Sequence, residues 1–179
     1  AHDLGARFFA MSATFPSVLR EVLLDVLGDG VAEIRAPQNI EDAFRRHTLR
    51  FIEGDLLQTT ALDAVHQRVA AGEAVLVVTT TVGRAQAAYD SLKTRLGEQV
   101  WMLHGRFTAG DRAGKEAELA RRVGTASRVE SGGTVLVATQ VVEVSLDVDF
   151  DVLFTDPAPI EALVQRFGRV NRGRRGGLR

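Results

Sequence analysis

The sequence predicts an α/β fold in which helices cover both faces of a mainly parallel sheet. Three short apolar runs are typical of strands buried on both faces: residues 74–80, which are rich in valine, and residues 134–139 and 152–155. Stretches with the spacing of amphipathic helices separate these runs. Strands that alternate with helices of about 12 residues favour right-handed βαβ units and a doubly wound sheet.

Turn and capping signals predict the other elements in order. We expect a strand over residues 6–13, a helix over residues 18–27 capped by Ser17, and short strands over residues 31–36 and 48–52. Thr60 and Asp63 have the spacing of a capping box for a helix through Ala70, and Thr108 and Asp111 have it for a helix to Val123. The remaining elements are expected to be a helix over 84–96, a strand over 100–103, a loop over 124–133 and a helix over 159–170.

Composition bounds the compartment and the partners. The 179 residues fit one domain, and the absence of cysteine excludes a thiolate metal site and favours a reducing cytoplasm. A net charge of −1 excludes a global basic field, but arginines recur from residue 166 to residue 179 without an acidic residue among them. No apolar stretch approaches the roughly 20 residues that span a bilayer, so no membrane partner is expected.

The run from Gln165 to Arg172 carries the strongest chemical signal. In a helix, Gln165, Arg169 and Arg172 would share one face at i, i+4 and i+7. A guanidinium group grips phosphate oxygens through two parallel hydrogen bonds, and it stabilises the charge that develops when a γ-phosphate is transferred. The residues alone are equally consistent with a solvated basic helix end.

This run matches motif VI of superfamily two helicases, and two further segments are similar to helicase motifs in the right order. Ser12-Ala13-Thr14 matches motif III, and residues 139–147 resemble motif V. Residues 103–107, 136–151 and 156–160 extend the resemblance to the CRISPR-associated helicase–nuclease of type I interference systems. The resemblance covers nearly the whole chain, although that family tends to carry Asn in place of Thr80 and Ser in place of Gly105.

The resemblance implies a RecA-like three-layer αβα domain, a P-loop NTPase-type fold that lacks the P-loop. Residues 1–15 would end the first RecA-like domain, and residues 16–179 would form the second. Since the chain contains no GxxxxGK[ST] sequence, ATP and Mg²⁺ would be bound mainly by the first domain. The implied partners are that first domain, single-stranded nucleic acid with DNA preferred, and a CRISPR surveillance complex.

The resemblance also implies roles for single residues. Arg169 and Arg172 would face the ATP phosphates, with Arg172 favoured as the arginine finger, and Gln165 would lie near the γ-phosphate or the attacking water. Asp147 would touch the ribose or a finger arginine. Nucleic acid would be contacted by residues that follow the strands, Thr80, His104, Arg106, Thr139 and Gln140. Ser12, Ala13 and Thr14 would couple the two domains.

Plainer interpretations of these residues stay open at this point. Thr139 can simply close a strand end, Asp147 can be a turn residue, and a single histidine such as His104 is more often structural. The histidines are scattered in the sequence, so no metal site is expected.

Three other functions are weighed against a CRISPR motor domain. One is a superfamily two helicase that acts on RNA or in DNA repair, and another is a non-catalytic interaction module on the same fold. The absence of G-x-G-x-x-G after the first strand disfavours the third, a dinucleotide-binding enzyme.

Overall fold

The computed structural model describes residues 9–11, 15–28, 31–43, 47–124, 132–144 and 146–173. Ser12, Ala13 and Thr14 lie outside the described residues, as does most of the predicted loop over 124–133. The chain divides into two compact units, Ala1–Arg45 and Arg46–Arg179, and each is considered by itself.

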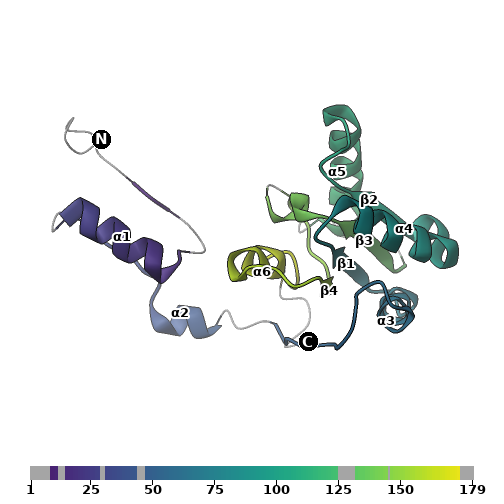
Figure 1. Ribbon diagram of the computed structural model, residues 1–179, viewed down its shortest axis with the longest axis horizontal. Coiled ribbons are helices and arrows are strands. Elements are labelled where there is room, and N and C mark those ends of the chain that lie inside the picture. The colour runs from purple at the N-terminus through teal and green to yellow at the C-terminus, as the bar shows by residue number, and fades with distance from the viewer. Residues whose placement is uncertain are drawn as a thin grey trace. The chain divides into compact units, whose positions relative to one another are not determined.

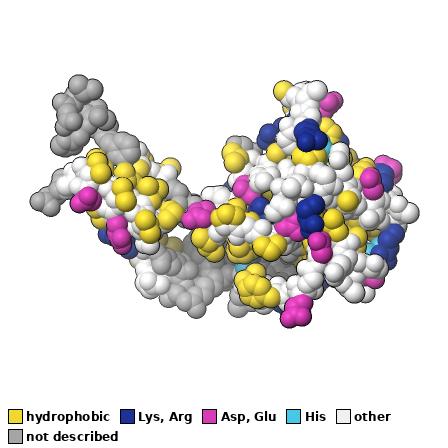
Figure 2. Space-filling view, in the orientation of Figure 1, with side chains coloured by type: hydrophobic (Ala, Val, Ile, Leu, Met, Phe, Trp, Pro, Cys, Tyr) yellow, Lys and Arg dark blue, Asp and Glu magenta, His cyan; other side chains and the backbone are white. Residues whose placement is uncertain are grey.

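The first unit contains the helices α1 (Ser17–Leu27) and α2 (Gln38–Ala43). Helix α1 was predicted, but Ser17 is its first residue rather than its cap, and Pro16 occupies the capping position. No residue of α1 is buried, and large apolar side chains cover part of its surface (Figure 2), Val18, Leu19, Val22 and Val26. The strand predicted over 31–36 is wrong: Ile34 is 91% exposed there, and no strand of this unit pairs with the segment in the described residues.

The second unit is built on a four-stranded parallel sheet with the order β2-β3-β1-β4. The strands are β1 (Ala74–Val78), β2 (Val100–Leu103), β3 (Thr134–Ala138) and β4 (Val152–Thr155). Leu76 at the centre of β1 pairs with Leu136 on one side and with Leu153 on the other. The predicted doubly wound sheet is therefore confirmed, with β2 and β4 at their predicted bounds.

Helices pack on both faces of this sheet and give three layers (Figure 1). On one face, α3 (Thr59–Ala70) and α4 (Val82–Leu96) bury Val65 and Leu92 against the side chains of β1 and β3. On the other face, α5 (Ala109–Val123) buries Leu119 and Val123 together with Phe150. Every residue of β1 is buried, as expected for a central strand covered on both faces. None of the helices in the described ranges is both long and apolar enough to cross a membrane.

The capping predictions have mixed outcomes. Thr108 caps α5 as predicted, since its Oγ1 accepts the Asp111 N–H at 3.2 Å and its hydroxyl donates to the Asp111 carboxylate at 2.7 Å. Helix α3 begins one residue before Thr60, and Gln58 takes the capping position without a side-chain cap. The Asp63 carboxylate instead forms an ion pair with Arg95 of α4, which explains why the predicted capping box does not form.

Two further predicted strands, one in each unit, are not seen in the described residues. Residues 48–52 form no strand, and Phe51 and Ile52 remain 92% and 62% exposed, because the described residues offer this segment no ladder partner. The strand predicted over 6–13 is also not seen in its described part, residues 9–11.

Helix α6 (Ile160–Phe167) ends three residues before the predicted end at Val170. The backbone leaves the helix to pair with Phe150, whose N–H donates to the Arg169 carbonyl and whose carbonyl accepts the Asn171 N–H, both at 2.9 Å. Gln165, Arg169 and Arg172 therefore do not share one helical face, and the prediction of a single polar ridge is wrong.

Candidate functional site

Part of the candidate site lies at the carboxyl edge of the sheet, where the loops that follow parallel strands meet. Thr80 follows β1, and Gln140 opens the short 3₁₀ helix η4 (Gln140–Glu143) after β3. The Gln140 side-chain amide donates to the Thr80 carbonyl at 3.2 Å. Two residues that the sequence assigned to nucleic-acid contact are thus brought together, and both are exposed.

Thr139 closes the end of β3, which is the structural role that the sequence analysis left open for it. It is only 3% exposed, and its N–H donates to the Leu103 carbonyl at 3.3 Å. Its carbonyl accepts the Val142 N–H at 3.4 Å. Thr139 therefore closes β3 and shapes the turn into η4, leaving Gln140 as the accessible member of this pair.

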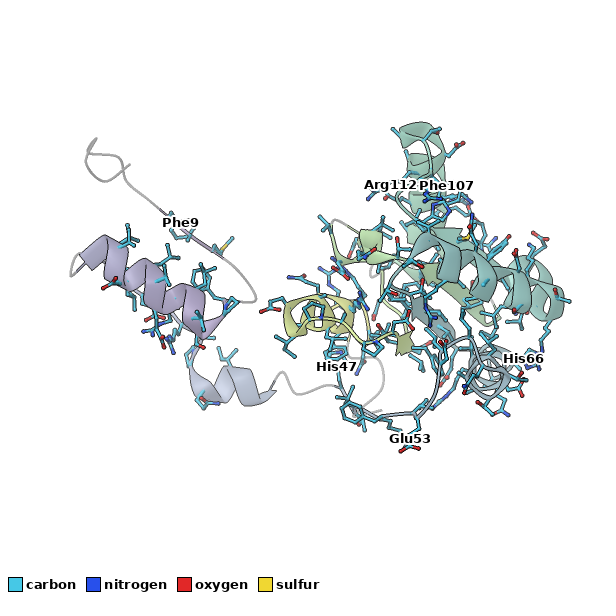
Figure 3. The ribbon with its side chains drawn as sticks, viewed as in Figure 1. Phe9, His47, Glu53, His66, Phe107 and Arg112 are labelled. Atoms are coloured by element: carbon cyan, nitrogen blue, oxygen red, sulfur yellow. The ribbon has the colours of Figure 1, made fainter. Side chains whose placement is uncertain are left out.

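His104 and Arg106 follow β2, but only one of them is accessible. His104 is 5% exposed, its ring stacks on Phe107 with centroids 4.3 Å apart, and its Nδ1 accepts the Arg106 N–H at 3.2 Å. Phe107 lies at the base of α5 in Figure 3. The buried ring fixes the conformation of this loop, and the loop presents the exposed Arg106.

The first arginine of the motif VI segment, Arg166, is buried and has no surface for a ligand. It is 2% exposed, its Nε donates to Glu143 Oε1 at 2.9 Å, and its Nη1 donates to Thr155 Oγ1 at 2.6 Å. These bonds join α6 to η4 and to the end of β4. Arg166 is thus a structural residue, which the pattern of arginines alone did not distinguish from its neighbours.

Arg169 is bound to backbone carbonyls of the motif V segment. Its guanidinium donates to the Glu143 carbonyl at 2.8 Å and to the Leu146 carbonyl, while its Nε–H has no acceptor among the described atoms. Burial lowers the pKa of Arg169, the neighbouring Arg172 lowers it further, and Asp147 opposes both effects. Arg169 therefore ties motif VI to motif V and keeps positive charge next to Arg172.

Arg172 has a fixed backbone and an accessible side chain. Its N–H donates to Asp149 Oδ1 at 2.7 Å, and the next N–H, of Gly173, donates to Asp149 Oδ2 at 2.9 Å. The guanidinium pairs with Asp147 at 2.9 Å, with side chains 43% and 66% exposed respectively. Asp147 thus pairs with an arginine of its own domain, and its predicted contact with the ribose or with a finger arginine across the cleft stays a prediction. Asp149, which is 3% exposed, escaped the sequence analysis because its alternation with Asp147 and Asp151 resembles an edge strand.

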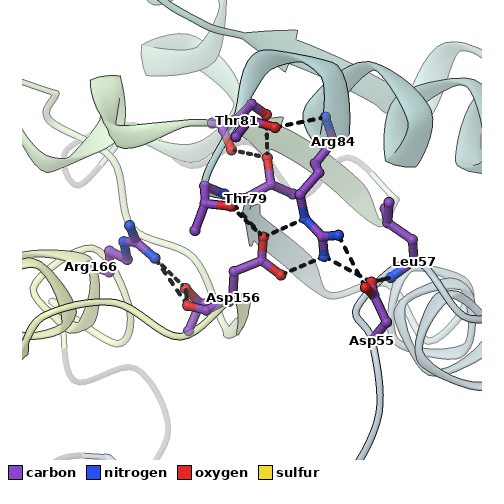
Figure 4. Close-up of polar contacts among 10 residues, drawn as sticks. Asp55, Leu57, Thr79, Thr81, Arg84, Asp156 and Arg166 are labelled. Carbon is purple, nitrogen blue, oxygen red and sulfur yellow. Dashed lines mark hydrogen bonds and ion pairs between the residues drawn. The ribbon is translucent and has the colours of Figure 1, made fainter.

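Asp156 forms a second anchor that the sequence did not reveal. Its carboxylate accepts the Thr80 N–H at 3.0 Å and two bonds from Arg84, which also pairs with Asp55 at 2.8 Å (Figure 4). The Arg84 side chain and the Leu57 N–H lower the pKa of Asp55 to about 2, and the carboxylates of Asp55 and Asp156 raise the pKa of Arg84.

Gln165 is half-buried on α6. Among the described residues, no three His, Asp or Glu side chains are grouped closely enough to hold a metal ion.

A parallel sheet in three layers, with Thr80, Arg106 and Gln140 at its carboxyl edge and an arginine segment bonded to the residues before β4, is typical of a RecA-like helicase domain of superfamily two. The comparison with known proteins agrees. The family described as "CRISPR-associated nuclease/helicase Cas3, C-terminal" matches residues 71–175. The chain belongs to the Cas3 family, as the motifs predicted, and corresponds to its C-terminal RecA-like part.

Individual relatives support this assignment. The chain is 33% identical to the CRISPR-associated endonuclease/helicase Cas3 of Escherichia coli (strain K12) over 97% of its length, and 30% identical to Cas3 of Streptococcus thermophilus over 94%. It spans 22% and 21% of those two proteins, about a fifth of their length.

Solved structures give the same result. The crystal structure of T. fusca Cas3 with AMPPNP matches 72% of this chain and 16% of its own, at a TM-score of 0.61 and 33% identity. S. cerevisiae Dbp5 bound to RNA and ADP BeF3 covers 93% of this chain and 42% of its own chain at a TM-score of 0.60, but its identity of 20% supports the fold alone.

Proposed function

We propose that this chain is the second motor domain of an ATP-dependent helicase that translocates on single-stranded DNA during CRISPR interference. ATP and Mg²⁺ would be held mainly by the first RecA-like domain, because this chain lacks the GxxxxGK[ST] sequence. This domain would close over the γ-phosphate and supply Arg172 as the finger. Water would then attack the γ-phosphorus, the bond to the β-phosphate oxygen would break, and ADP and phosphate would form.

The geometry of Arg172 carries the proposal. A finger needs a backbone that does not move and a guanidinium that can leave its resting partner. Asp149 binds two consecutive N–H groups around Arg172, whereas Asp147 holds the guanidinium through one exposed ion pair. An exposed pair of this kind contributes only about 0–1 kcal/mol, so a phosphate can replace Asp147 at little cost.

The nucleic-acid surface in this proposal consists of Thr80, Arg106 and Gln140. These exposed residues follow three different strands. A motor that acts on any sequence needs contacts to the sugar–phosphate backbone of the nucleic acid rather than to its bases. The preference for DNA is part of this proposal, and a role in recruitment to a surveillance complex draws support from a related structure. One similar chain is part of a "CRISPR RNA-guided surveillance complex, pre-nicking", with 34% identity, a TM-score of 0.55 and coverage of 71% of this chain and 16% of that one.

The experiment measures ATP hydrolysis by the full-length parent with single-stranded DNA, with single-stranded RNA and with neither. We expect DNA to stimulate turnover and Arg172→Ala to lower the stimulated rate by about 10³-fold or more, as removal of an arginine finger does. Arg68→Ala is the matched control, because Arg68 is an exposed arginine, paired with Glu73, that precedes the amino end of β1. This control should retain the wild-type rate.

Each other outcome has a defined meaning. Stimulation by RNA alone would keep the motor and remove the CRISPR assignment. Turnover that is unchanged in Arg172→Ala, or indifferent to both nucleic acids, would favour an interaction module on this fold.

A further inference from the structure

We propose that Asp156 is a positioning residue that couples the nucleic-acid loop at Thr80 to the arginine segment over residues 166–172. Asp156 lies outside motifs III, V and VI, and this inference rests on the proposed motor function. The inference concerns how binding of nucleic acid at Thr80 affects the position of Arg172.

The carboxylate of Asp156 fixes the loop after β1. It accepts the Thr80 N–H at 3.0 Å, the Thr80 hydroxyl at 3.3 Å, and the Nε and Nη2 groups of Arg84 at 2.9 and 2.8 Å (Figure 4). The Asp156 side chain is 7% exposed. A buried carboxylate with four donors has a single orientation, so Thr80 cannot move without moving Asp156.

The backbone next to this carboxylate fixes the arginine segment. The Asp156 carbonyl accepts Arg166 Nη1 at 3.3 Å, and the Thr155 hydroxyl accepts the same group at 2.6 Å. Arg166 and Arg169 belong to one turn, since the Arg169 N–H donates to the Arg166 carbonyl at 3.0 Å. Asp156 is therefore bonded through its side chain to Thr80, a residue of the proposed nucleic-acid surface. Through its backbone it is bonded to Arg166, in the segment that carries Arg172.

These contacts close into a ring through η4. The first residue of η4, Gln140, donates to the Thr80 carbonyl, and its last residue, Glu143, accepts Arg166 Nε. Three loops after β1, β3 and β4 thus share one chain of hydrogen bonds. In such a ring a displacement at Thr80 can be transmitted to Arg166 by two routes, one through Asp156 and one through Gln140 and Glu143 of η4.

The structure also indicates that a neutral variant can fold. Removing one member of a buried ion pair is costly when the other charge is left alone. In Asp156→Asn, Arg84 keeps its two bonds to Asp55, at 3.1 and 2.8 Å, and the asparagine oxygen can still accept the Thr80 N–H. The variant weakens the coupling contact without stranding a charge.

The test compares DNA-stimulated with DNA-free ATP turnover in the full-length parent, at saturating ATP and saturating single-stranded DNA. For Asp156→Asn we expect the ratio of these rates to fall by roughly 2- to 30-fold, the range found when a coupling contact is removed. Asp151→Asn is the matched control. Asp151 stands at the other end of β4, where its carboxylate accepts the Ala74 N–H at 2.9 Å, so its loss should leave the ratio at the wild-type value.

Two further variants decide the remaining cases. Arg84→Lys keeps the charge and loses the two-bond geometry, so it should lower the same ratio even if Asp156→Asn does not fold. The double variant should be no worse than Asp156→Asn alone, since both changes affect one contact. If both rates fall equally and the ratio is unchanged, Asp156 is merely structural and the inference is overturned. A wild-type parent that DNA does not stimulate would refute the proposed motor function as well.

Discussion

Two aspartates, two positions apart in the sequence, bind Arg172 in different ways. Asp149 is buried and accepts backbone N–H groups, while Asp147 is exposed and accepts a side-chain donor. The two partly buried backbone bonds to Asp149 contribute about 1 kcal/mol each, whereas an exposed ion pair contributes about 0–1 kcal/mol. Asp149 therefore fixes the backbone of the segment, whereas a phosphate can replace Asp147 as the partner of the Arg172 guanidinium.

This difference gives a prediction for amide hydrogen exchange in the full-length parent. Asp149→Ala should accelerate exchange at Arg172 and Gly173 by about tenfold or more, because both N–H groups lose their acceptor. Asp147→Ala removes a neighbouring carboxylate of the same charge and should leave these amides protected. Equal acceleration in the two variants would contradict the assignment of Asp149 as the anchor.

Among the helices and strands, the sequence correctly predicted those that are determined by local apolar runs and capping residues. Short apolar runs marked β1, β3 and β4 correctly, and capping at Thr108 placed the start of α5. Strands were also predicted over 31–36 and 48–52, and these are wrong. A strand also needs a neighbour to satisfy its backbone, and a local pattern cannot supply that information.

In the candidate site, too, the features that follow from local sequence were predictable, and the long-range contacts were not. Thr80, Arg106 and Gln140 come to one edge because they follow parallel strands, and that follows from topology. The anchors were not predictable, since Arg84 and Asp156 are 72 residues apart in the sequence and meet only in the folded chain. The end of α6 was missed for a similar reason: pairing with Phe150 overrides the helical pattern of residues 168–170.

A close approach between α3 and β3 gives a prediction at this scale. A Cβ atom on Gly133 would collide with the Val69 backbone carbonyl in the last turn of α3, whereas a Cβ on Gly132 would meet nothing within 4 Å. Gly133→Ala should therefore destabilise the domain by roughly 1–3 kcal/mol, and Gly132→Ala should not. Scanning calorimetry of the parent protein would show the difference as a lower melting temperature for the first variant, and equal temperatures would contradict it.

For the whole molecule, the proposed function makes the described residues one side of an ATP site whose other side lies in the first RecA-like domain. The net charge of −1 gives no long-range attraction to nucleic acid, so binding depends on a few local arginines. In its described residues the first unit, Ala1–Arg45, adds the exposed apolar helix α1. Activity should therefore require the partner domain.

Residues 1–179 produced alone should hydrolyse ATP negligibly. They should bind single-stranded DNA weakly, with an affinity that falls steeply as salt rises, because few phosphate contacts are available. Turnover assays and binding titrations at two salt concentrations would check both statements. Turnover at the rate of the parent would show that the proposed division of the ATP site is incorrect.

The aspartates at the two ends of β4 also determine which changes this strand tolerates. Asp151 accepts a backbone N–H where β1 begins, and Asp156 accepts one just beyond its end. Both bonds form only when the number of residues between the two carboxylates is unchanged. An insertion or deletion in β4 would therefore break one of the two bonds, so the length of this strand is set by a fixed distance between two carboxylates.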